Sequence, residues 1–234
     1  MSVTIEPIKP LVGSKVTVDK AHLTDPDVVA AIRAALEERG VLVFPAIGLS
    51  DDEQLAITDA LGGRGNYNNK VPGGNVSAKD VYKITLDKEV NREPDYVLGT
   101  FFWHVDGVTV DQPLPKATLL SARTLSDEGG ATEFANLYAA WDKLPDDEKK
   151  QYDGLKVIHT IEASVRPVFG NPSEERISRW RSMGEPMERL LRSLASIQAL
   201  FPPRADASDE NGTTRKCEFP TRSFTERASS ARSA

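Results

Sequence analysis

Hydrophobic and polar residues alternate in short stretches at the start of the sequence and then follow a helical repeat. The alternation near residues 5–8 and 16–18 predicts two short strands. Apolar residues recur every three or four positions over residues 26–39, which predicts an amphipathic helix that ends at Gly40. The apolar run at residues 41–44 predicts a further short strand.

Strand-like patterns dominate the middle of the sequence, and helical patterns lie on either side of them. Ser50 and Glu53 have the spacing of a capping box, which predicts a helix that begins there and ends at Gly62. Further helices are predicted after Asn136 and Pro145. Strands are predicted over residues 81–86, 101–106, 117–122 and 155–162. This order favours a mainly β fold with flanking helices, a sandwich or barrel, over a nucleotide-binding α/β fold.

The composition changes near residue 186, which predicts two parts of the chain. Residues 1–186 carry 21 basic and 29 acidic side chains, a net charge of −8, whereas residues 187–234 carry 8 and 6, a net charge of +2. Residues 187–200 have apolar positions at helical spacing, which predicts an amphipathic helix. Residues 202–234 are rich in Ser, Arg and Ala and have the composition of a disordered segment.

The overall composition narrows the class of protein. The chain has 234 residues, a formal net charge of −6 and 39% hydrophobic residues, which suits a globular protein with a sizeable core. The negative charge argues against a general affinity for nucleic-acid phosphates. No apolar run approaches the ~20 residues that span a bilayer, and the first residues lack the pattern of a secretory signal. With Cys217 as its single cysteine, the chain is expected to be cytoplasmic and to bind neither nucleic acid nor a membrane.

The chemistry of the sequence is concentrated in the triplet His104-Val105-Asp106. Residues two apart on an extended strand point to the same face, so the imidazole of His104 and the carboxylate of Asp106 can reach one metal ion. A second, distant His would complete a 2-His-1-carboxylate site that leaves coordination positions on Fe(II) open. Taken alone, the triplet is equally compatible with a buried structural His.

Several blocks around this triplet match a known family. Trp-His-x-Asp at residues 103–106 is followed by an apolar stretch, by Gly-Gly-x-Thr-x-Phe-Ala-Asn at 129–136 and by Gly-Leu-x-x-x-His at 154–159. Together with residues 34–62, these blocks resemble the taurine-dioxygenase-like (TauD/TfdA) family of Fe(II)/2-oxoglutarate-dependent dioxygenases. The resemblance covers about residues 1–186.

The resemblance implies a fold, a reaction and a set of binding residues. The fold is a double-stranded β-helix, or jelly roll, and the reaction is hydroxylation of a small organic substrate, an anion in several relatives, with O₂ and 2-oxoglutarate. His104 and Asp106 match the two proximal iron ligands. Thr132 matches the threonine whose hydroxyl binds a carboxylate of 2-oxoglutarate. The implied partners are the small-molecule substrate and O₂, and a homo-oligomer is left open.

The sequence departs from the family after residue 186. The family completes its site with a distal His and an Arg that binds 2-oxoglutarate, but the histidines here are His22, His104 and His159 alone. His159 matches a family His that is not a ligand, and His22 precedes the first predicted helix. The jelly roll is therefore expected to be incomplete at its C-terminal end, as after truncation or a frameshift. Metal binding and turnover are expected to be weak, because a lost ligand costs more than a lost supporting contact.

Two other interpretations of the same residues stay open. The chain is compatible with a catalytically inactive remnant of the family, or with a cupin-like module that binds a different divalent metal. Loss of 2-oxoglutarate coupled to formation of succinate would support the dioxygenase. Metal binding without that reaction would support the cupin-like module.

Overall fold

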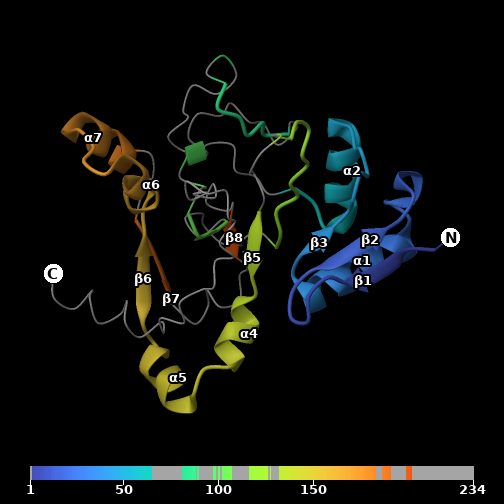
Figure 1. The fold of residues 1–234 in the computed structure, drawn as a ribbon, viewed down its shortest axis with the longest axis horizontal. Coiled ribbons are helices and arrows are strands. Elements are labelled where there is room, and N and C mark those ends of the chain that lie inside the picture. The colour runs from blue at the N-terminus through green and yellow to red at the C-terminus, as the bar shows by residue number, and fades with distance from the viewer. Residues whose placement is uncertain are drawn as a thin grey trace, which may run out of the picture. The chain divides into compact units, whose positions relative to one another are not determined.

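A computed structural model describes most of the first two hundred residues of the chain (Figure 1). The described residues are 2–64, 81–87, 89, 97–98, 100, 102–106, 116–125, 127, 132–182, 186–190 and 199–201. The chain divides into two compact units, residues 1–203 and 204–234, and every described residue lies in the first. The predicted disorder of residues 202–234 therefore falls outside the described residues.

The helices and strands of the first unit follow one another in a mixed order. They are β1 (Thr4–Pro7), β2 (Ser14–Thr17), a short 3₁₀ helix (Lys20–His22), α1 (Pro26–Arg39), β3 (Leu42–Val43), α2 (Asp51–Leu61), β4 (His104–Val105), β5 (Glu133–Ala135), α4 (Leu137–Asp142), α5 (Asp146–Tyr152), β6 (Lys156–His159), α6 (Ile161–Phe169), α7 (Glu174–Ser182), β7 (Met187–Leu190) and β8 (Ala199–Phe201). Among the described residues, no helix is long and apolar enough to cross a membrane.

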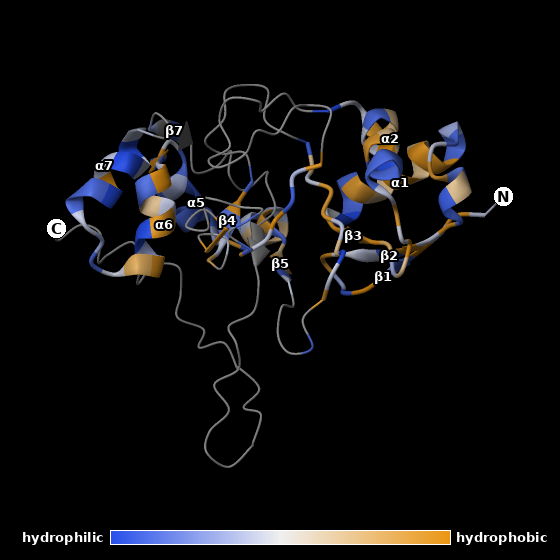
Figure 2. Cartoon of the chain, turned by 90° about the horizontal axis from the view of Figure 1, so that it is seen from above, coloured by the Kyte–Doolittle hydropathy of each residue, from blue (hydrophilic) through white to orange (hydrophobic). Residues whose placement is uncertain are grey.

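The N-terminal elements form a small sheet with two helices. β2 lies between β1, its antiparallel neighbour, and β3, which runs parallel to it. Apolar side chains of α1 and α2 share one core, in which Ile32 is 1% exposed and Ile57 4% exposed. Figure 2 shows apolar positions along these strands and helices beside hydrophilic ones, as the sequence pattern predicts.

The ends of α1 and α2 follow the local signals in the sequence. α1 has Pro26 in its first turn and ends at Gly40, whose positive φ of 66° is the left-handed conformation that glycine adopts readily. At the start of α2, the Ser50 hydroxyl accepts a hydrogen bond from the Glu53 backbone N–H, and the Glu53 carboxylate accepts one from the Ser50 backbone N–H. The predicted capping box is confirmed.

A second sheet brings together distant segments of the chain. Its strand order is β4-β8-β5, and β8 is antiparallel to both neighbours. Leu200 of β8 is paired with His104 on one side and with Phe134 on the other. Residues paired across antiparallel strands lie on the same face of a sheet, so the positions of His104 and Phe134 share one face.

The C-terminal part of the described chain contains an antiparallel pair, β6 and β7, and two packed helices. His159 of β6 is paired with Met187 of β7. Val165 of α6 and the α7 residues Ile177 and Trp180 form a small buried cluster, and the Trp180 ring lies 5.5 Å from that of Phe169. This cluster holds α6 against α7 by burial of apolar surface.

Two strand predictions in the middle of the chain are wrong. Residues 81–86 and 117–122 are all described, and neither segment is a strand. Alternation indicates an extended, half-buried chain, but a strand also needs a neighbour that completes its backbone hydrogen bonds. In the second segment the Leu119 carbonyl instead accepts a hydrogen bond from the Gln54 side chain.

Two further segments differ in part from their predicted secondary structure. The strand predicted over residues 155–162 is shorter, because Thr160 accepts a hydrogen bond from the Ala163 backbone N–H and starts α6. The helix predicted over residues 187–200 is wrong at both described ends, which are β7 and β8. Strand partners supply backbone hydrogen bonds there, and such tertiary pairing overrides helical periodicity.

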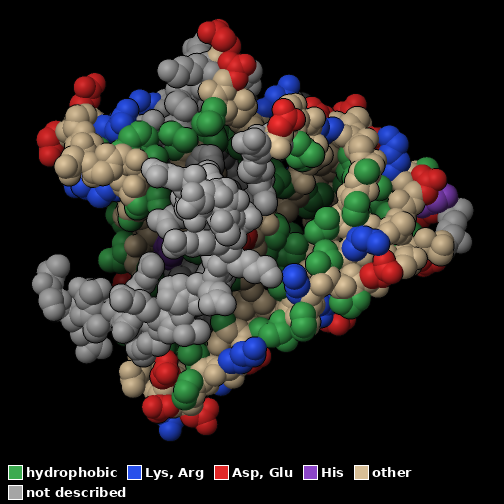
Figure 3. Space-filling model, in the orientation of Figure 1, with side chains coloured by type: hydrophobic (Ala, Val, Ile, Leu, Met, Phe, Trp, Pro, Cys, Tyr) green, Lys and Arg blue, Asp and Glu red, His purple; other side chains and the backbone are tan. Residues whose placement is uncertain are grey.

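The visible face of the molecule carries no concentrated charge in its described part. In Figure 3, acidic and basic side chains are interspersed, with apolar side chains between them. Helices account for more of the described residues than strands do. The described residues thus contain more helix than the mainly β fold that the sequence predicts, and their strands form three short sheets.

The contribution of the capping box to stability can be tested by mutation. Ser50→Ala removes the side-chain acceptor at the start of α2 and is expected to lower the free energy of unfolding by about 1 kcal/mol. Chemical denaturation measures this. Thr24→Ala is the control, because Thr24 is exposed and lies before Asp25, which is the N-cap residue of α1. Equal losses of stability in the two variants would contradict the role of Ser50.

Candidate metal centre

The side chains of His104 and Asp106 converge at the end of β4. The His104 Nε2 atom lies 3.5 Å from the Asp106 Oδ1 atom. Two ligand atoms on adjacent corners of an octahedron, each about 2.1 Å from the metal, lie about 3 Å apart. The two side chains therefore face the same way, as the i, i+2 spacing predicts, and a small shift would let both atoms reach one ion.

The orientation of the His104 ring is set by its other nitrogen. Nδ1 lies 2.7 Å from the Phe102 carbonyl oxygen. Because a carbonyl can only accept, Nδ1 carries the hydrogen of this bond, and in the neutral ring the lone pair is on Nε2. A backbone carbonyl on the far nitrogen is the usual arrangement for a histidine that binds a metal. Nε2 thus points toward Asp106, and its lone pair can bind a metal only when the ring is neutral.

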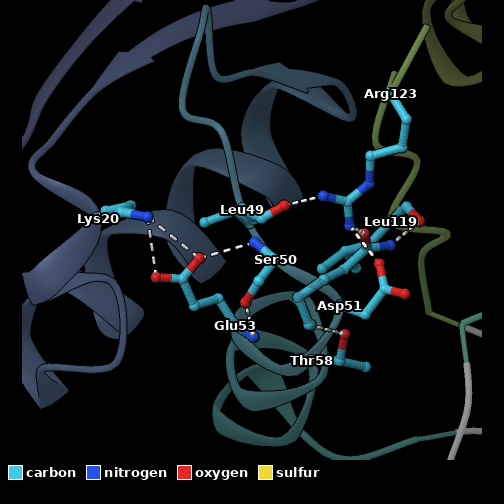
Figure 4. A network of polar contacts seen from close by, with 9 residues as sticks. Lys20, Leu49, Ser50, Asp51, Glu53, Thr58, Leu119 and Arg123 are labelled. Atoms are coloured by element: carbon cyan, nitrogen blue, oxygen red, sulfur yellow. Dashed lines mark hydrogen bonds and ion pairs between the residues drawn. The ribbon is translucent and has the colours of Figure 1, made fainter.

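Residues 116–125, to which sequence analysis assigned no role in the site, make polar contacts with α2. We call them the tether segment. The Gln54 side chain of α2 donates a hydrogen bond of 3.1 Å to the Leu119 carbonyl oxygen, and Arg123 lies 2.7 Å from Asp51 Oδ1 (Figure 4). Thr118 of this segment contributes to the lowered pKa of the Asp106 carboxyl.

The electrostatics of the pair are those of an imidazolium and a carboxylate. Burial by itself lowers the pKa of His104, but the Asp106 carboxylate and the Phe102 carbonyl outweigh burial and raise that pKa above 6.5. Burial raises the pKa of Asp106, but its hydrogen bonds to His104 and Thr118 outweigh burial and leave that pKa below its ordinary value. Without a metal, the pair is therefore ionised on both sides in weakly acidic solution.

The directions of these two pKa shifts predict how pH affects folding stability and metal binding. The pair stabilises the folded chain between the ordinary pKa values of Asp and His, and loses this effect above the raised His104 pKa and below the lowered Asp106 pKa. The contribution is small because both side chains are about a third exposed. A metal needs the neutral imidazole, so protons compete with it as the pH falls through the His104 pKa.

Thr132 lies immediately before β5. It is exposed, and strand alternation through β5 places residue 132 on the face of Phe134, which is also the face of His104. The preceding Gly129 and Gly130 fall outside the described residues. The structure thus puts Thr132 next to the strand that shares a sheet with β4, and its binding role stays a prediction.

The other two histidines are placed elsewhere. His22 ends the short 3₁₀ helix before α1, and its Nδ1 atom lies 3.0 Å from the Asp25 Oδ2 atom. His159 lies on β6. In the part of the chain that the structure describes, no group of three or more His, Cys, Asp or Glu side chains is arranged to hold a metal ion. Neither His22 nor His159 therefore joins His104 and Asp106.

The two ligand atoms, from His104 and Asp106, suit a divalent metal ion. An imidazole nitrogen and a carboxylate oxygen are ligands that suit Fe(II) and Mn(II), and two such side chains leave several coordination positions for other groups. The ring of His104 is oriented in advance by its hydrogen bond to the Phe102 carbonyl. His104 and Asp106 therefore fit two positions of a metal site, and other groups would have to supply its remaining ligands.

A similar fold occurs in a solved structure with a bound metal ion. The crystal structure of AAD-2 in complex with Mn(II) and N-oxalylglycine matches with a TM-score of 0.59 and 26% identity, over 82% of this chain and 64% of that chain. This likeness supports the double-stranded β-helix that the motifs imply. Two curated relatives are an alpha-ketoglutarate-dependent 2,4-dichlorophenoxyacetate dioxygenase from Cupriavidus pinatubonensis (strain JMP 134 / LMG 1197) and an alpha-ketoglutarate-dependent sulfate ester dioxygenase from Pseudomonas putida.

The sequence match defines the family. The first relative is 32% identical over 169 residues, which are 68% of this chain and 58% of the relative. The second is 28% identical over 180 residues, which are 75% of this chain and 56% of the relative. The model of the family described as "Taurine catabolism dioxygenase TauD, TfdA family" matches residues 4–227. The chain belongs to this family of dioxygenases, as its motifs predict.

The extent of the match differs between the comparisons. The family match continues past residue 186, where the motifs in the sequence end. The chain spans a little more than half the length of the two curated relatives.

The His104–Asp106 pair can be tested without a metal. The His104 ring, followed by NMR in a metal-free pH titration, is expected to have its midpoint above 6.5. Asp106→Asn is expected to lower this midpoint, because it removes the carboxylate charge beside Nε2. Glu133→Gln, which removes a charge from β5 of the same sheet, is the control and should leave the midpoint unchanged. A wild-type midpoint at or below 6.5 would contradict the pairing.

Proposed function

We propose that this chain carries part of the active site of an Fe(II)- and 2-oxoglutarate-dependent dioxygenase that hydroxylates a small organic anion. The observation that carries the proposal is the convergence of His104 Nε2 and Asp106 Oδ1, 3.5 Å apart, within the family's Trp-His-x-Asp block. Both are metal ligands in the proposal. The fold match to AAD-2, which was solved in complex with Mn(II) and N-oxalylglycine, supports it.

Each residue has a defined part in the proposed site. His104 donates its Nε2 lone pair while its Nδ1–H stays on the Phe102 carbonyl, so the ring cannot turn away. Asp106 offsets part of the positive charge of a divalent ion. When iron is bound, its chemistry couples the conversion of 2-oxoglutarate and O₂ into succinate and CO₂ to insertion of the second oxygen atom into a C–H bond of the substrate.

Thr132 has the proposed role of binding 2-oxoglutarate. Thr132 is exposed beside β5, at a position on the sheet face that also carries the His104 position. A hydroxyl that donates to a carboxylate makes a charge-assisted hydrogen bond, which is stronger than a bond between neutral groups. This contact would orient the co-substrate toward the metal ligands.

The substrate class follows from the relatives. One is named for an aryloxyacetate and another for sulfate esters, and both kinds of compound carry a negative charge next to an organic group. We propose a substrate of the same kind for this chain, with O₂ as the second reactant.

The described residues supply no third protein ligand for the proposed site. No His follows His159, and no third ligand joins His104 and Asp106 among the described residues. A chain of this sequence alone is therefore proposed to bind the metal weakly and to turn over slowly, with the β-helix incomplete after its proximal part. An inactive remnant of the family is the alternative that this observation favours.

Removal of the ligands tests the proposed centre. Anaerobic Fe(II) and 2-oxoglutarate added to the full chain should produce a visible charge-transfer absorption, and His104→Ala or Asp106→Ala should abolish it because each removes a ligand. His22→Ala is the matched control, since it removes an imidazole that contacts Asp25 instead. Metal binding without 2-oxoglutarate consumption would favour a cupin-like module. A flat titration with the wild-type chain would favour the inactive remnant.

Thr132 makes a separate test of co-substrate binding. Thr132→Val is expected to weaken 2-oxoglutarate binding by about 10- to 150-fold, since hydrogen bonds to charged groups contribute roughly 1.5–3 kcal/mol. Isothermal titration of the Mn(II)-loaded chain measures this, and Thr132→Ser should restore most of the affinity. An unchanged dissociation constant for 2-oxoglutarate in Thr132→Val would contradict the assignment.

A further inference from the structure

We propose that Asn136 is a positioning residue that fixes the register of β5 and thereby keeps position 132 on the sheet face of the candidate metal ligands. The inference rests on the proposed function, because it takes Thr132 as the residue that binds 2-oxoglutarate. Asn136 contacts neither the metal nor the co-substrate in this scheme. It acts through β5, the strand that Thr132 directly precedes.

The Asn136 side chain makes two hydrogen bonds to different parts of the chain. Its Oδ1 atom accepts a hydrogen bond of 3.0 Å from the Ala139 backbone N–H and so caps α4. Its Nδ2 atom donates to the Leu11 carbonyl oxygen, 2.6 Å away, in the turn between β1 and β2. Because a helix cap needs only the acceptor, the hydrogen bond to Leu11 is a separate contact that joins the end of β5 to the N-terminal elements.

The turn that carries the Leu11 carbonyl is itself held by Arg39 of α1. The Arg39 guanidinium donates to the carbonyl oxygens of Lys9 and Pro10, the latter at 3.2 Å. A hydrogen bond to a restrained partner costs less conformational entropy than one to a mobile partner, so the Leu11 carbonyl is a firm attachment point. The N-terminal elements are thus linked by polar contacts to both the tether segment and Asn136.

The strand β5 has few contacts of its own that could fix its register. It is three residues long, it pairs with β8, which is also three residues long, and it leads directly into α4 (Figure 1). A slip of one residue against β8 would turn every side chain of β5 to the opposite face, and position 132 would leave the face of His104. Such a slip moves residue 136 by about 3.3 Å. It would break the hydrogen bond to Leu11, which belongs neither to β5 nor to α4.

Substitutions at Asn136 can separate its two contacts. Asn136→Asp keeps an oxygen that caps α4 but cannot donate to the Leu11 carbonyl, and Asn136→Ser, a cap with a shorter side chain, serves if the Asp variant does not fold. Thr160→Ala is the matched control, because Thr160 caps α6, a helix that follows β6 instead of β5. One readout is the 2-oxoglutarate dissociation constant of the full Mn(II)-loaded chain, from isothermal titration. The other is hydrogen exchange of the β5 amides in the metal-free chain.

Asn136→Asp is expected to raise the 2-oxoglutarate dissociation constant about tenfold, the lower end of the usual cost of losing a supporting contact behind a binding group. It should also speed hydrogen exchange in β5, whereas Thr160→Ala should leave both readouts at their wild-type values. The double variant of Thr132→Val with Asn136→Asp should bind no more weakly than Thr132→Val alone, because Asn136 acts through Thr132 and the two effects are then not additive.

The outcomes that would overturn this inference are distinct from those that concern the proposed function. Additive losses in the double variant, or equal hydrogen exchange of β5 in wild type and Asn136→Asp, would overturn the role of Asn136. So would unchanged 2-oxoglutarate affinity in Asn136→Asp when Thr132→Val binds more weakly, and the proposed function would then stand. Absence of 2-oxoglutarate binding by the wild-type chain would instead overturn the proposed function, and this inference with it.

Discussion

The sheet that carries the candidate site depends on its middle strand. β8 forms hydrogen bonds with β4 on one side and with β5 on the other, and Leu200 is paired with both His104 and Phe134. Within the described chain, no other strand joins β4 to β5. The face that presents His104 and the segment that carries Thr132 are therefore brought into one sheet by three residues, Ala199–Phe201, that follow them by a long stretch of sequence.

The elements that the sequence predicted well are those decided by neighbouring residues. The capping box of Ser50 and Glu53, the Gly40 end of α1 and the Asn136 cap of α4 all depend on side chains within four positions of one another. The wrong predictions share a different cause. A distant segment that offers backbone hydrogen bonds decides whether a stretch forms a strand, and no local pattern encodes this. This applies to residues 81–86, 117–122 and 187–200.

The candidate site likewise has features that the local sequence predicts and features that depend on the fold. The convergence of His104 and Asp106 could be predicted because two positions on one extended segment share a face. The docking of residues 116–125 on α2 through Gln54 could not, since it depends on contacts between distant segments. The spacing of a motif thus identified the candidate ligands, whereas the contact of residues 116–125 with α2 required the fold.

The late place of β8 in the sequence also affects how the chain is made. During synthesis, β4 and β5 leave the ribosome well before Ala199–Phe201, and until then neither strand has its partner in the sheet β4-β8-β5. Unpaired strand edges can template pairing with other chains, and pairing between distant residues slows folding. Until β8 is made, the edges of β4 and β5 therefore stay unpaired, and the face that carries His104 is assembled only after Ala199–Phe201 has emerged.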